Sequence, residues 1–408
     1  MANKEQKIYM KEAETALVHT YNRFPLVIDR AEDVYVYDTD GNKYLDFMAG
    51  IAVSSLGYAN AKFSAALKEQ IDSILHTSNL YYNRSIIEAA KKLTRAAQMD
   101  RVFFTNSGTE AIEGALKAAK RYAYNRDGHA GHTVIAMEHA FHGRSLGALS
   151  ITGTKHYRDP FEPLLPGVSF AKYNDFDSVQ ALVTDQTCAI ILETLQGEGG
   201  IYPAEPAFLE QIRALCDAKD ILLILDEIQC GMGRTGYMFA WQEYGVRPDI
   251  MTVAKAIGNG VPVGAFLVTE RIAQSSLEPG DHGTTYGGNP FVGRAVSTVL
   301  DIYEEEQITA HVQRVGAYLE EQLAGLVCRY DYLTEQRGKG LIRGLETTLP
   351  VGEVTNRALK QGLLVISAGT NVIRLVPPLI IEKQHVDEMI EKLTIALAET
   401  AAKQTAKE

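Results

Sequence analysis

The sequence ILLILDEIQCGMGRTGYMFAWQEYGVRPDIMTVAK, residues 221–255, determines how the rest of the chain is interpreted. Residues 221–225 form an apolar run that is too short for a helix. Such a run is typical of a strand that is buried on both faces, as in a parallel sheet. Residues 250–254 form a second short apolar run of this kind. We therefore predict two strands of an open α/β sheet.

Charged residues follow each of these strands. Asp226 and Glu227 follow the first, and Lys255 follows the second and enters the turn at residues 258–260. Open α/β sheets bind ligands at the edge where such strand ends meet. Taken singly, the acid is more often a helix cap and the lysine a solvated surface residue. Together, a carboxylate and an amine at two strand ends suit pyridoxal phosphate, which needs a lysine anchor and an acidic partner for its ring nitrogen.

A dinucleotide is the competing cofactor, because residues 231–236 fit the pattern GxGxxG. That pattern indicates a dinucleotide site when its glycines directly follow a strand and open a helix. Here residues 227–230 intervene, and the aromatic-rich stretch YMFAW follows in place of a helix. We therefore favour pyridoxal phosphate.

Composition and charge exclude several classes of protein. At 408 residues, the chain is long enough for more than one lobe. Its net charge of −11, with no basic stripe, argues against nucleic acid or an anionic membrane as a partner. The four cysteines lack metal-ligand or redox spacing, which indicates a reducing compartment. No segment has the pattern of a signal peptide or a membrane span. We expect a cytoplasmic protein without a metal site.

The order of predicted elements divides the chain into three parts. Residues 1–58 contain the short strands of an antiparallel meander and form the N-terminal segment of a small domain. Residues 59–297 alternate strands with helical segments, which is the rhythm of a mostly parallel sheet covered by helices. This part is the large, cofactor-binding domain. Residues 298–408 form the C-terminal, α+β part of the small domain.

A candidate anion site follows the strand predicted at residues 102–104. The loop there contains SGTEA at residues 107–111, and helical periodicity follows it. The free N–H groups of a helix N-terminus attract anions, and the hydroxyls of Ser107 and Thr109 can reach phosphate oxygens. An ordinary N-cap is the alternative.

Three further loops carry candidate side chains. In HAFHGR, residues 139–144, Phe141 can stack on a flat ring and Arg144 can hold a carboxylate, although a core Phe and a surface Arg are the simpler interpretation. QGEGG at residues 196–200 places an acid in a glycine loop without a histidine pattern for a metal. TTYGGNP at residues 284–290 is a second glycine- and hydroxyl-rich loop, or else a flexible surface turn.

Six motifs occur in one order along the chain: SGTEA, HAFHGR, QGEGG, DEIQCGMGRTG, AKAIGNG and TTYGGNP. Together they resemble the ω-aminotransferase subgroup of fold-type I pyridoxal-phosphate enzymes, over nearly the whole chain. The resemblance implies an α/β fold with a mostly parallel central sheet and a smaller α+β domain built from both termini. One departure is Tyr58, because the family usually carries His at this position after Gly57.

The resemblance also implies how the cofactor ring is held. Lys255 anchors the cofactor covalently and carries the substrate proton, and Asp226 keeps the ring nitrogen protonated. An adjacent carboxylate can raise the pKa of a cation by about 1–3 units, and a protonated ring is the better electron sink. The ring lies between Phe141 and Ile228, and its hydroxyl accepts a hydrogen bond from Gln229.

The phosphate contacts implied by the resemblance come from two subunits. Ser107, Gly108 and Thr109 hold the phosphate in one subunit, and Thr285 reaches it from the neighbouring one. A shared phosphate site implies a homodimer with two active sites at its interface.

The substrate contacts follow from the same comparison. The two substrates are an amino donor that reacts through its terminal amine, and glutamate. Arg144 holds the carboxylate of either substrate that lies far from the cofactor, and Arg374 binds the carboxylate of glutamate that lies near the cofactor. Glu198 pairs with Arg374 when the other substrate is bound, because an unpaired buried arginine is costly.

Within the subgroup, RFPLVI, FMAGIAV and PGDHGTTYGGNP are most similar to the members that act on acetylornithine. The expected reaction moves the terminal amine of N2-acetylornithine to 2-oxoglutarate, in arginine biosynthesis. The same chemistry on 4-aminobutyrate, succinylornithine or ornithine is the nearest alternative. A pyridoxal-phosphate decarboxylase, mutase or racemase, and a nucleotide-binding protein without this activity, are alternatives of other classes.

Overall fold

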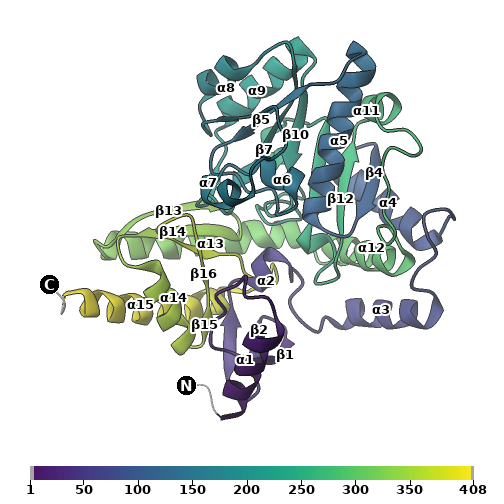
Figure 1. The fold of residues 1–408 in the computed structure, drawn as a ribbon. Helices are drawn as coiled ribbons and strands as arrows, with labels where there is room; N and C mark the ends of the chain where they lie inside the picture. Colours follow the sequence, from purple (N-terminus) through teal and green to yellow (C-terminus); the bar gives the residue numbers. More distant parts are fainter. Residues whose placement is uncertain (1–3, 406–408) are drawn as a thin grey trace.

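The computed structural model describes residues 4–405 and is organised around one seven-stranded sheet (Figure 1). β12 is antiparallel to both of its neighbours, β11 and β4, and the other strand pairs are parallel. This arrangement confirms the mostly parallel central sheet of an α/β protein. In spatial order, the strands are β4 (Arg101–Thr105), β12 (Gly264–Val268), β11 (Ile250–Ala254), β10 (Leu222–Asp226), β7 (Thr187–Glu193), β5 (Thr133–Met137) and β6 (Val168–Ala171).

The central strands are buried on both faces, which explains their continuous apolar sequence. In β10, Leu223 and Leu225 enter one hydrophobic core, and Leu222 and Ile224 enter the other. Helices complete each core and leave the strand ends as the edge where ligands bind in such folds. The first core includes α4 (Arg84–Ala97), α9 (Pro206–Lys219) and α12 (Pro290–Glu305), and the second includes α5 (Gly108–Asp127).

The smaller lobe combines both ends of the chain, and Figure 1 shows α1 and α15 within it. Its first sheet joins an N-terminal meander to a C-terminal strand, because β15 pairs in parallel with β3. This sheet contains β1 (Ile28–Glu32), β2 (Tyr35–Asp38), β3 (Lys43–Asp46) and β15 (Leu363–Leu364). A second sheet has the order β13 (Leu333–Lys339), β14 (Ile342–Thr347), β17 (Val372–Leu375) and β16 (Ile366–Ala368).

The domain limits predicted from the sequence stay a prediction. α12 runs across the limit expected at residues 297–298. Residues 1–3 and 406–408 of the terminal segments lie outside the described part of the chain. The remaining helices are α1 (Lys4–Ala16), α2 (Ala49–Ala52), α3 (Ala61–Ser73), α6 (Leu146–Ser150), α7 (Lys155–Arg158), α8 (Phe176–Leu182), α10 (Trp241–Tyr244), α11 (Glu270–Ser275), α13 (Ile308–Arg329), α14 (Val351–Lys360) and α15 (Lys383–Thr405). Short elements complete the chain: β8 (Leu195–Gln196), β9 (Tyr202–Pro203), η1 (Asp159–Phe161) and η2 (Lys255–Ile257).

The GxGxxG stretch at residues 231–236 lies in a series of turns and does not open a helix. Four residues separate it from the end of β10, and the next helix, α10, begins only at Trp241. The local structure therefore lacks the strand–glycine–helix geometry that a dinucleotide site needs.

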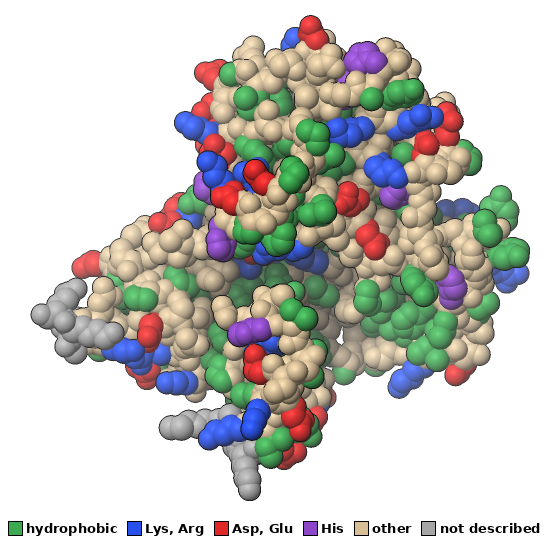
Figure 2. All heavy atoms as spheres, viewed as in Figure 1, with side chains coloured by type: hydrophobic (Ala, Val, Ile, Leu, Met, Phe, Trp, Pro, Cys, Tyr) green, Lys and Arg blue, Asp and Glu red, His purple; other side chains and the backbone are tan. Residues whose placement is uncertain are grey.

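Several large apolar side chains are exposed together on one surface of the molecule. Figure 2 shows hydrophobic side chains gathered over α3 and the loop that follows it. In this region Leu80, Tyr81 and Tyr82 are 88%, 71% and 98% exposed. Contiguous exposed apolar surface of this kind marks an interaction site.

Among the described residues, no helix is both long and apolar enough to cross a membrane.

Candidate active site

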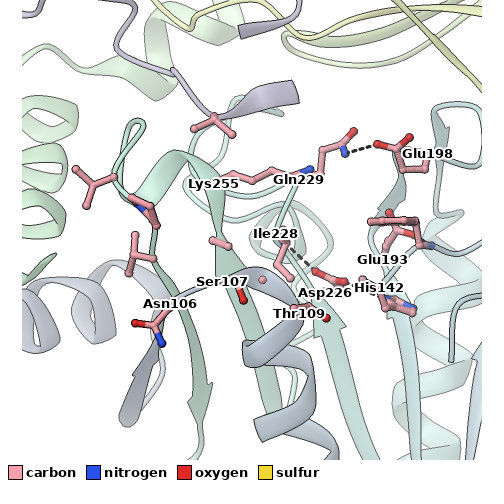
Figure 3. Close-up of a pocket in the computed structure, with 18 of the residues that line it drawn as sticks. Asn106, Ser107, Thr109, His142, Glu193, Glu198, Asp226, Ile228, Gln229 and Lys255 are labelled. Carbon is pink, nitrogen blue, oxygen red and sulfur yellow. Dashed lines mark hydrogen bonds and ion pairs between the residues drawn. The ribbon is translucent and has the colours of Figure 1, made fainter. Parts of the chain in front are cut away.

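The register of three parallel strands brings polar side chains to one edge of the sheet. Asp226, the last residue of β10, pairs with Glu193 of β7 on one side and with Thr252 of β11 on the other. Lys255 directly follows β11. Asp226, Glu193 and Lys255 line one cavity of about 320 Å³, and Figure 3 shows them converging on it together with Ser107.

The Asp226 carboxylate is buried and accepts hydrogen bonds from three residues. Oδ2 accepts from Nδ1 of His142 at 2.7 Å. Oδ1 accepts from the backbone N–H of Ile228 at 3.0 Å and from the hydroxyl of Thr252 at 3.2 Å. Several donors of this kind favour the charged form of a buried carboxylate. Asp226 is therefore arranged to present a fixed negative charge to the cavity.

Sequence reasoning missed His142, although it lies in the HAFHGR motif next to Phe141. The His142 side chain is completely buried, and its Nε2 has no hydrogen-bond partner among the described residues. Thr252 was also missed, because its place beside Asp226 follows from strand register and not from a local motif.

Lys255 has an amine with an altered acidity. Burial lowers the pKa of Lys255 from its usual 10.5 to about 8, against the opposing effect of the nearby Glu198 carboxylate. Its backbone is in the left-handed region, with φ at 50°, which is uncommon for a residue other than glycine. A lysine with a pKa near 8 exchanges a proton readily near neutral pH.

The predicted phosphate cradle forms at the N-terminus of α5. Ser107 is the N-cap, and its hydroxyl accepts from the backbone N–H of Glu110 at 3.3 Å. The Thr109 hydroxyl is 2.7 Å from Oγ of Ser145 and accepts from the Ser145 backbone N–H at 3.2 Å. Ser145 Oγ in turn donates to Glu113 at 2.6 Å, so the Thr109 hydroxyl donates to Ser145. The donors left for an anion are therefore the backbone N–H groups of Gly108 and Thr109 and the hydroxyl of Ser107.

A second group of charges lies across the cavity from this cradle. Glu198 forms an ion pair with Arg374, which comes from β17 of the smaller lobe. Gln229 bridges the pair: its Nε2 donates to Glu198 at 3.3 Å, as in Figure 3, and its Oε1 accepts from Arg374 at 3.0 Å. Burial by itself raises the pKa of Glu198, but the charge and hydrogen bond of Arg374 outweigh it and hold that pKa below its usual value.

Two further buried acids support the loops around the cavity. Glu193 accepts from the backbone N–H groups of Phe141 and Gly197, each at 3.0 Å. Glu227 accepts from the backbone N–H groups of Ala240 and Trp241 at 2.8 and 2.9 Å. Burial raises the pKa of Glu193 and of Glu227 to about 7. These contacts make both acids part of the scaffold around the site.

The structure brings nine of the predicted site residues together around the cavity: Ser107, Gly108, Thr109, Phe141, Glu198, Asp226, Ile228, Gln229 and Lys255. Arg374 reaches the same group through Glu198 and Gln229. Two other predicted residues, like Arg374, do not line the cavity. Arg144 is exposed, with its guanidinium 3.8 Å from the centre of the Tyr157 ring, and Thr285 is exposed in its loop.

These residues fit pyridoxal phosphate. The cavity has an anion-binding helix end, apolar and aromatic walls from Ile228 and Phe141, a hydrogen-bonded carboxylate and a desolvated amine. Gly108 contributes space as well, because a Cβ there would lie 3.0 Å from Cδ1 of Ile228. A side chain at residue 108 would therefore crowd the wall on which a flat ring is expected to rest.

Comparisons with known proteins cover almost all of the chain. The family model for Aminotransferase class-III matches residues 17–397. An acetylornithine aminotransferase of Methanocaldococcus jannaschii is 44% identical over 373 residues, which cover 91% of this chain and 94% of that protein. An ornithine aminotransferase of Toxoplasma gondii, solved with partial occupancy of pyridoxal phosphate at its active site, has a TM-score of 0.94 at 28% identity and covers 98% of this chain and 96% of its own. An acetylornithine aminotransferase of Elizabethkingia anophelis has a TM-score of 0.87 at 29% identity, covering 97% of this chain and 100% of its own.

The lowered pKa of Lys255 predicts how the apoprotein takes up pyridoxal phosphate. Only the neutral amine attacks the cofactor aldehyde, so the rate of covalent attachment should rise with pH and level off above the pKa of about 8. At pH 7 the rate should be about tenfold below the plateau. Stopped-flow absorbance across this pH range measures it, with free N-acetyl-lysine as the control. A rate that keeps rising to pH 10, as for the free amine, would show that Lys255 is not desolvated.

Proposed function

This chain belongs to the class-III aminotransferase family, and from that membership we propose that it moves the terminal amine of N2-acetylornithine to 2-oxoglutarate. The products are N-acetylglutamate semialdehyde and glutamate, and the reaction is a cytoplasmic step of arginine biosynthesis. The observation that carries the proposal is the Glu198–Gln229–Arg374 network beside Lys255, because it lets one cavity accept two unlike substrates.

Pyridoxal phosphate is the cofactor of this enzyme, and when bound it supplies an electron sink for the carbon that loses its proton. We assign Lys255 as its covalent anchor and as the base that moves the substrate proton. Asp226 faces the ring nitrogen, and Phe141 and Ile228 cover the two faces of the ring. The contacts assigned to the phosphate are those of Ser107, Gly108 and Thr109, with Thr285 from a second subunit.

Gln229 is assigned two tasks. The resemblance places its amide on the ring hydroxyl, and in the structure that amide is hydrogen-bonded to both members of the Glu198–Arg374 pair. Because this amide contacts both the ring hydroxyl and the Glu198–Arg374 pair, Gln229 couples the charge at the ring to whether that ion pair is formed.

Substrate selection follows from where each substrate carries its carboxylates. Acetylornithine enters with its terminal amine toward Lys255, so its apolar stem faces Arg374. Glutamate enters with its α-amine there, so its α-carboxylate lies near the same arginine. A buried arginine without a partner is costly, and Glu198 removes that cost while acetylornithine is bound. For glutamate, Glu198 swings away and Arg374 binds the carboxylate. Arg144 is assigned to the distal carboxylate in both cases.

We propose that the enzyme acts as a homodimer. Thr285 is exposed and lies outside the cavity of its own chain, as expected of a residue that serves a second subunit. The apolar surface at Leu80, Tyr81 and Tyr82 supports the proposal, since a second copy would bury it. Tyr286 follows Thr285 in the same loop and is 63% exposed, so this loop also presents an exposed aromatic side chain.

Ornithine is the second candidate donor, because the structural likeness to an ornithine aminotransferase extends over nearly the whole chain. Free ornithine carries a charged α-amine at the position where acetylornithine carries a neutral amide. The two donors therefore differ in the charge that the cavity must hold far from Lys255.

The proposed function is tested by a panel of amino donors assayed for glutamate formation from 2-oxoglutarate. We expect acetylornithine to give a kcat/KM at least about tenfold above those of succinylornithine, ornithine and 4-aminobutyrate. A higher value for any other donor would replace acetylornithine as the substrate. Turnover of the donor without 2-oxoglutarate would point to a decarboxylase, mutase or racemase.

The Glu198–Arg374 pair predicts opposite effects of two substitutions. Glu198→Ala leaves Arg374 available, so it should raise the half-reaction rate with glutamate relative to that with acetylornithine. Arg374→Ala removes the partner of the near carboxylate and should slow the glutamate half-reaction about 100-fold or more, while largely sparing the acetylornithine half. Stopped-flow measurement of each half-reaction in both variants tests these opposite effects. The selection mechanism fails if both variants slow the two halves in equal proportion.

A further inference from the structure

A strained turn lies beside the cavity, at residues 49–52. All four of its residues have positive φ: 47° at Ala49, 64° at Gly50, 66° at Ile51 and 62° at Ala52. L-amino acids disfavour this left-handed conformation, and a branched residue such as Ile51 is a genuine outlier there. A run of such residues persists only when the surrounding structure holds it in place.

The buried carboxylate of Asp46 holds the start of this turn. Its Oδ1 accepts from the backbone N–H groups of Met48 at 2.8 Å and of Ala49 at 2.9 Å. Its Oδ2 accepts from the hydroxyl of Tyr58 at 2.7 Å. One carboxylate therefore connects the strained turn to the Tyr58 side chain.

Tyr58 is itself fixed by its backbone. Asp33 and Tyr58 exchange two backbone hydrogen bonds, of 3.0 and 2.8 Å. The residue before Tyr58 has to be glycine, because Gly57 has a φ of 66° and a Cβ there would lie 2.3 Å from the carbonyl oxygen of Asp33. The phenol is thus held on the Asp46 carboxylate from a rigid base. Tyr58 is also the position at which this chain departs from the family it resembles.

The segment that contains the turn reaches the active site. Val53, the residue after the turn, lines the same cavity as Lys255 and Glu198. Further along, the backbone N–H of Leu56 donates to Oδ1 of Asn259 at 2.9 Å, and Asn259 lies in the turn that follows Lys255. The strained turn is therefore tied at one end to Asp46 and at the other to the lysine segment.

We propose that Tyr58 is a positioning residue for the substrate wall of the active site. Its hydroxyl orients the Asp46 carboxylate, which holds residues 49–52 in the left-handed turn and so keeps Val53 against the cavity. Without the hydroxyl, Oδ2 of Asp46 loses its hydrogen-bond partner among the described residues, so only the two bonds of Oδ1 orient the carboxylate and the turn relaxes. The wall then moves away from the bound amino donor. The inference rests on the proposed function only in taking this cavity as the place where the donor binds.

Tyr58→Phe tests the inference in the holoenzyme, and Tyr44→Phe is its matched control. Tyr44 lies on β3, and its hydroxyl donates to the carboxylate of Asp38 at 3.0 Å, so the same atoms are removed from a similar contact that does not reach the cavity. Two measurements are made: hydrogen exchange of the peptide covering residues 47–56, and KM and kcat for whichever ω-amine donor the wild type uses best.

For Tyr58→Phe we expect faster exchange in that peptide and a KM raised about tenfold or more, since a hydrogen bond to a charged group is worth about one to two powers of ten. The kcat should stay within about twofold, because the groups around Lys255 are unchanged. Tyr44→Phe should change neither exchange nor KM. A purely structural role for Tyr58 would lower the melting temperature without changing KM, and that result overturns the proposal.

Asp46→Asn supplies the coupling test. The amide oxygen can still accept from Met48 and Ala49, so this variant should fold. If Tyr58 acts through Asp46, adding Tyr58→Phe to Asp46→Asn should raise KM much less than it does in the wild type. Full additivity of the two changes contradicts the proposal. Because the donor is chosen from the wild-type panel, a wrong assignment of acetylornithine leaves this test intact.

Discussion

The Asp226 carboxylate accepts hydrogen bonds from His142, Ile228 and Thr252, and the chemistry of the cavity depends on its charge staying there. A buried carboxylate without such partners would be neutralised by desolvation. Thr252 lies on β11 and His142 in the loop after β5, so these two donors reach Asp226 only when the strands are correctly paired. Ile228 lies in the turn that directly follows Asp226. The fold therefore determines where the charge lies. Pairing of β7, β10 and β11 aligns the acidic ends of the strands, and Lys255 enters the cavity beside them.

The other charges of the site are balanced in the same low-dielectric surroundings. Burial lowers the pKa of Lys255 to about 8, and Glu198 opposes that shift. The same Glu198 neutralises Arg374, which comes from the smaller lobe. One acid therefore links the anchor amine to the arginine that we assign to substrate selection. A change of substrate that displaces Glu198 alters both partners together, and this shared dependence is what makes the pair suited to alternate between two substrates.

Two segments with strained backbone lie next to this cavity. Lys255 and residues 49–52 all have positive φ. Lys255 lines the cavity, and residues 49–52 directly precede Val53, which also lines it. Strain of this kind is retained where it positions functional groups, and the surrounding contacts have to compensate for it. Asp46 compensates at the turn, and Asn259 connects the turn to the lysine segment.

Much of the fold and part of the site follow from the sequence. The strand at residues 250–254 was predicted with its observed limits, because buried parallel strands are continuous apolar runs. Asp226 and Lys255 were found because strand ends were located. β13 was missed, since its residues LTEQRGK are polar and lie at a sheet edge. Thr252 depends on register, and the left-handed turn at AGIA has no sequence signal, so neither could be predicted.

The isosteric substitution Asp226→Asn tests whether the chemistry of the cavity depends on the charge of this carboxylate. It keeps the shape of the side chain and removes its charge. We expect the apoprotein still to take up pyridoxal phosphate, with affinity lowered by less than about tenfold, while the half-reaction with an amino donor slows at least about 100-fold. Cofactor titration and single-turnover kinetics on one preparation give both numbers. Equal losses of affinity and rate would contradict the claim, because they would make Asp226 a structural residue.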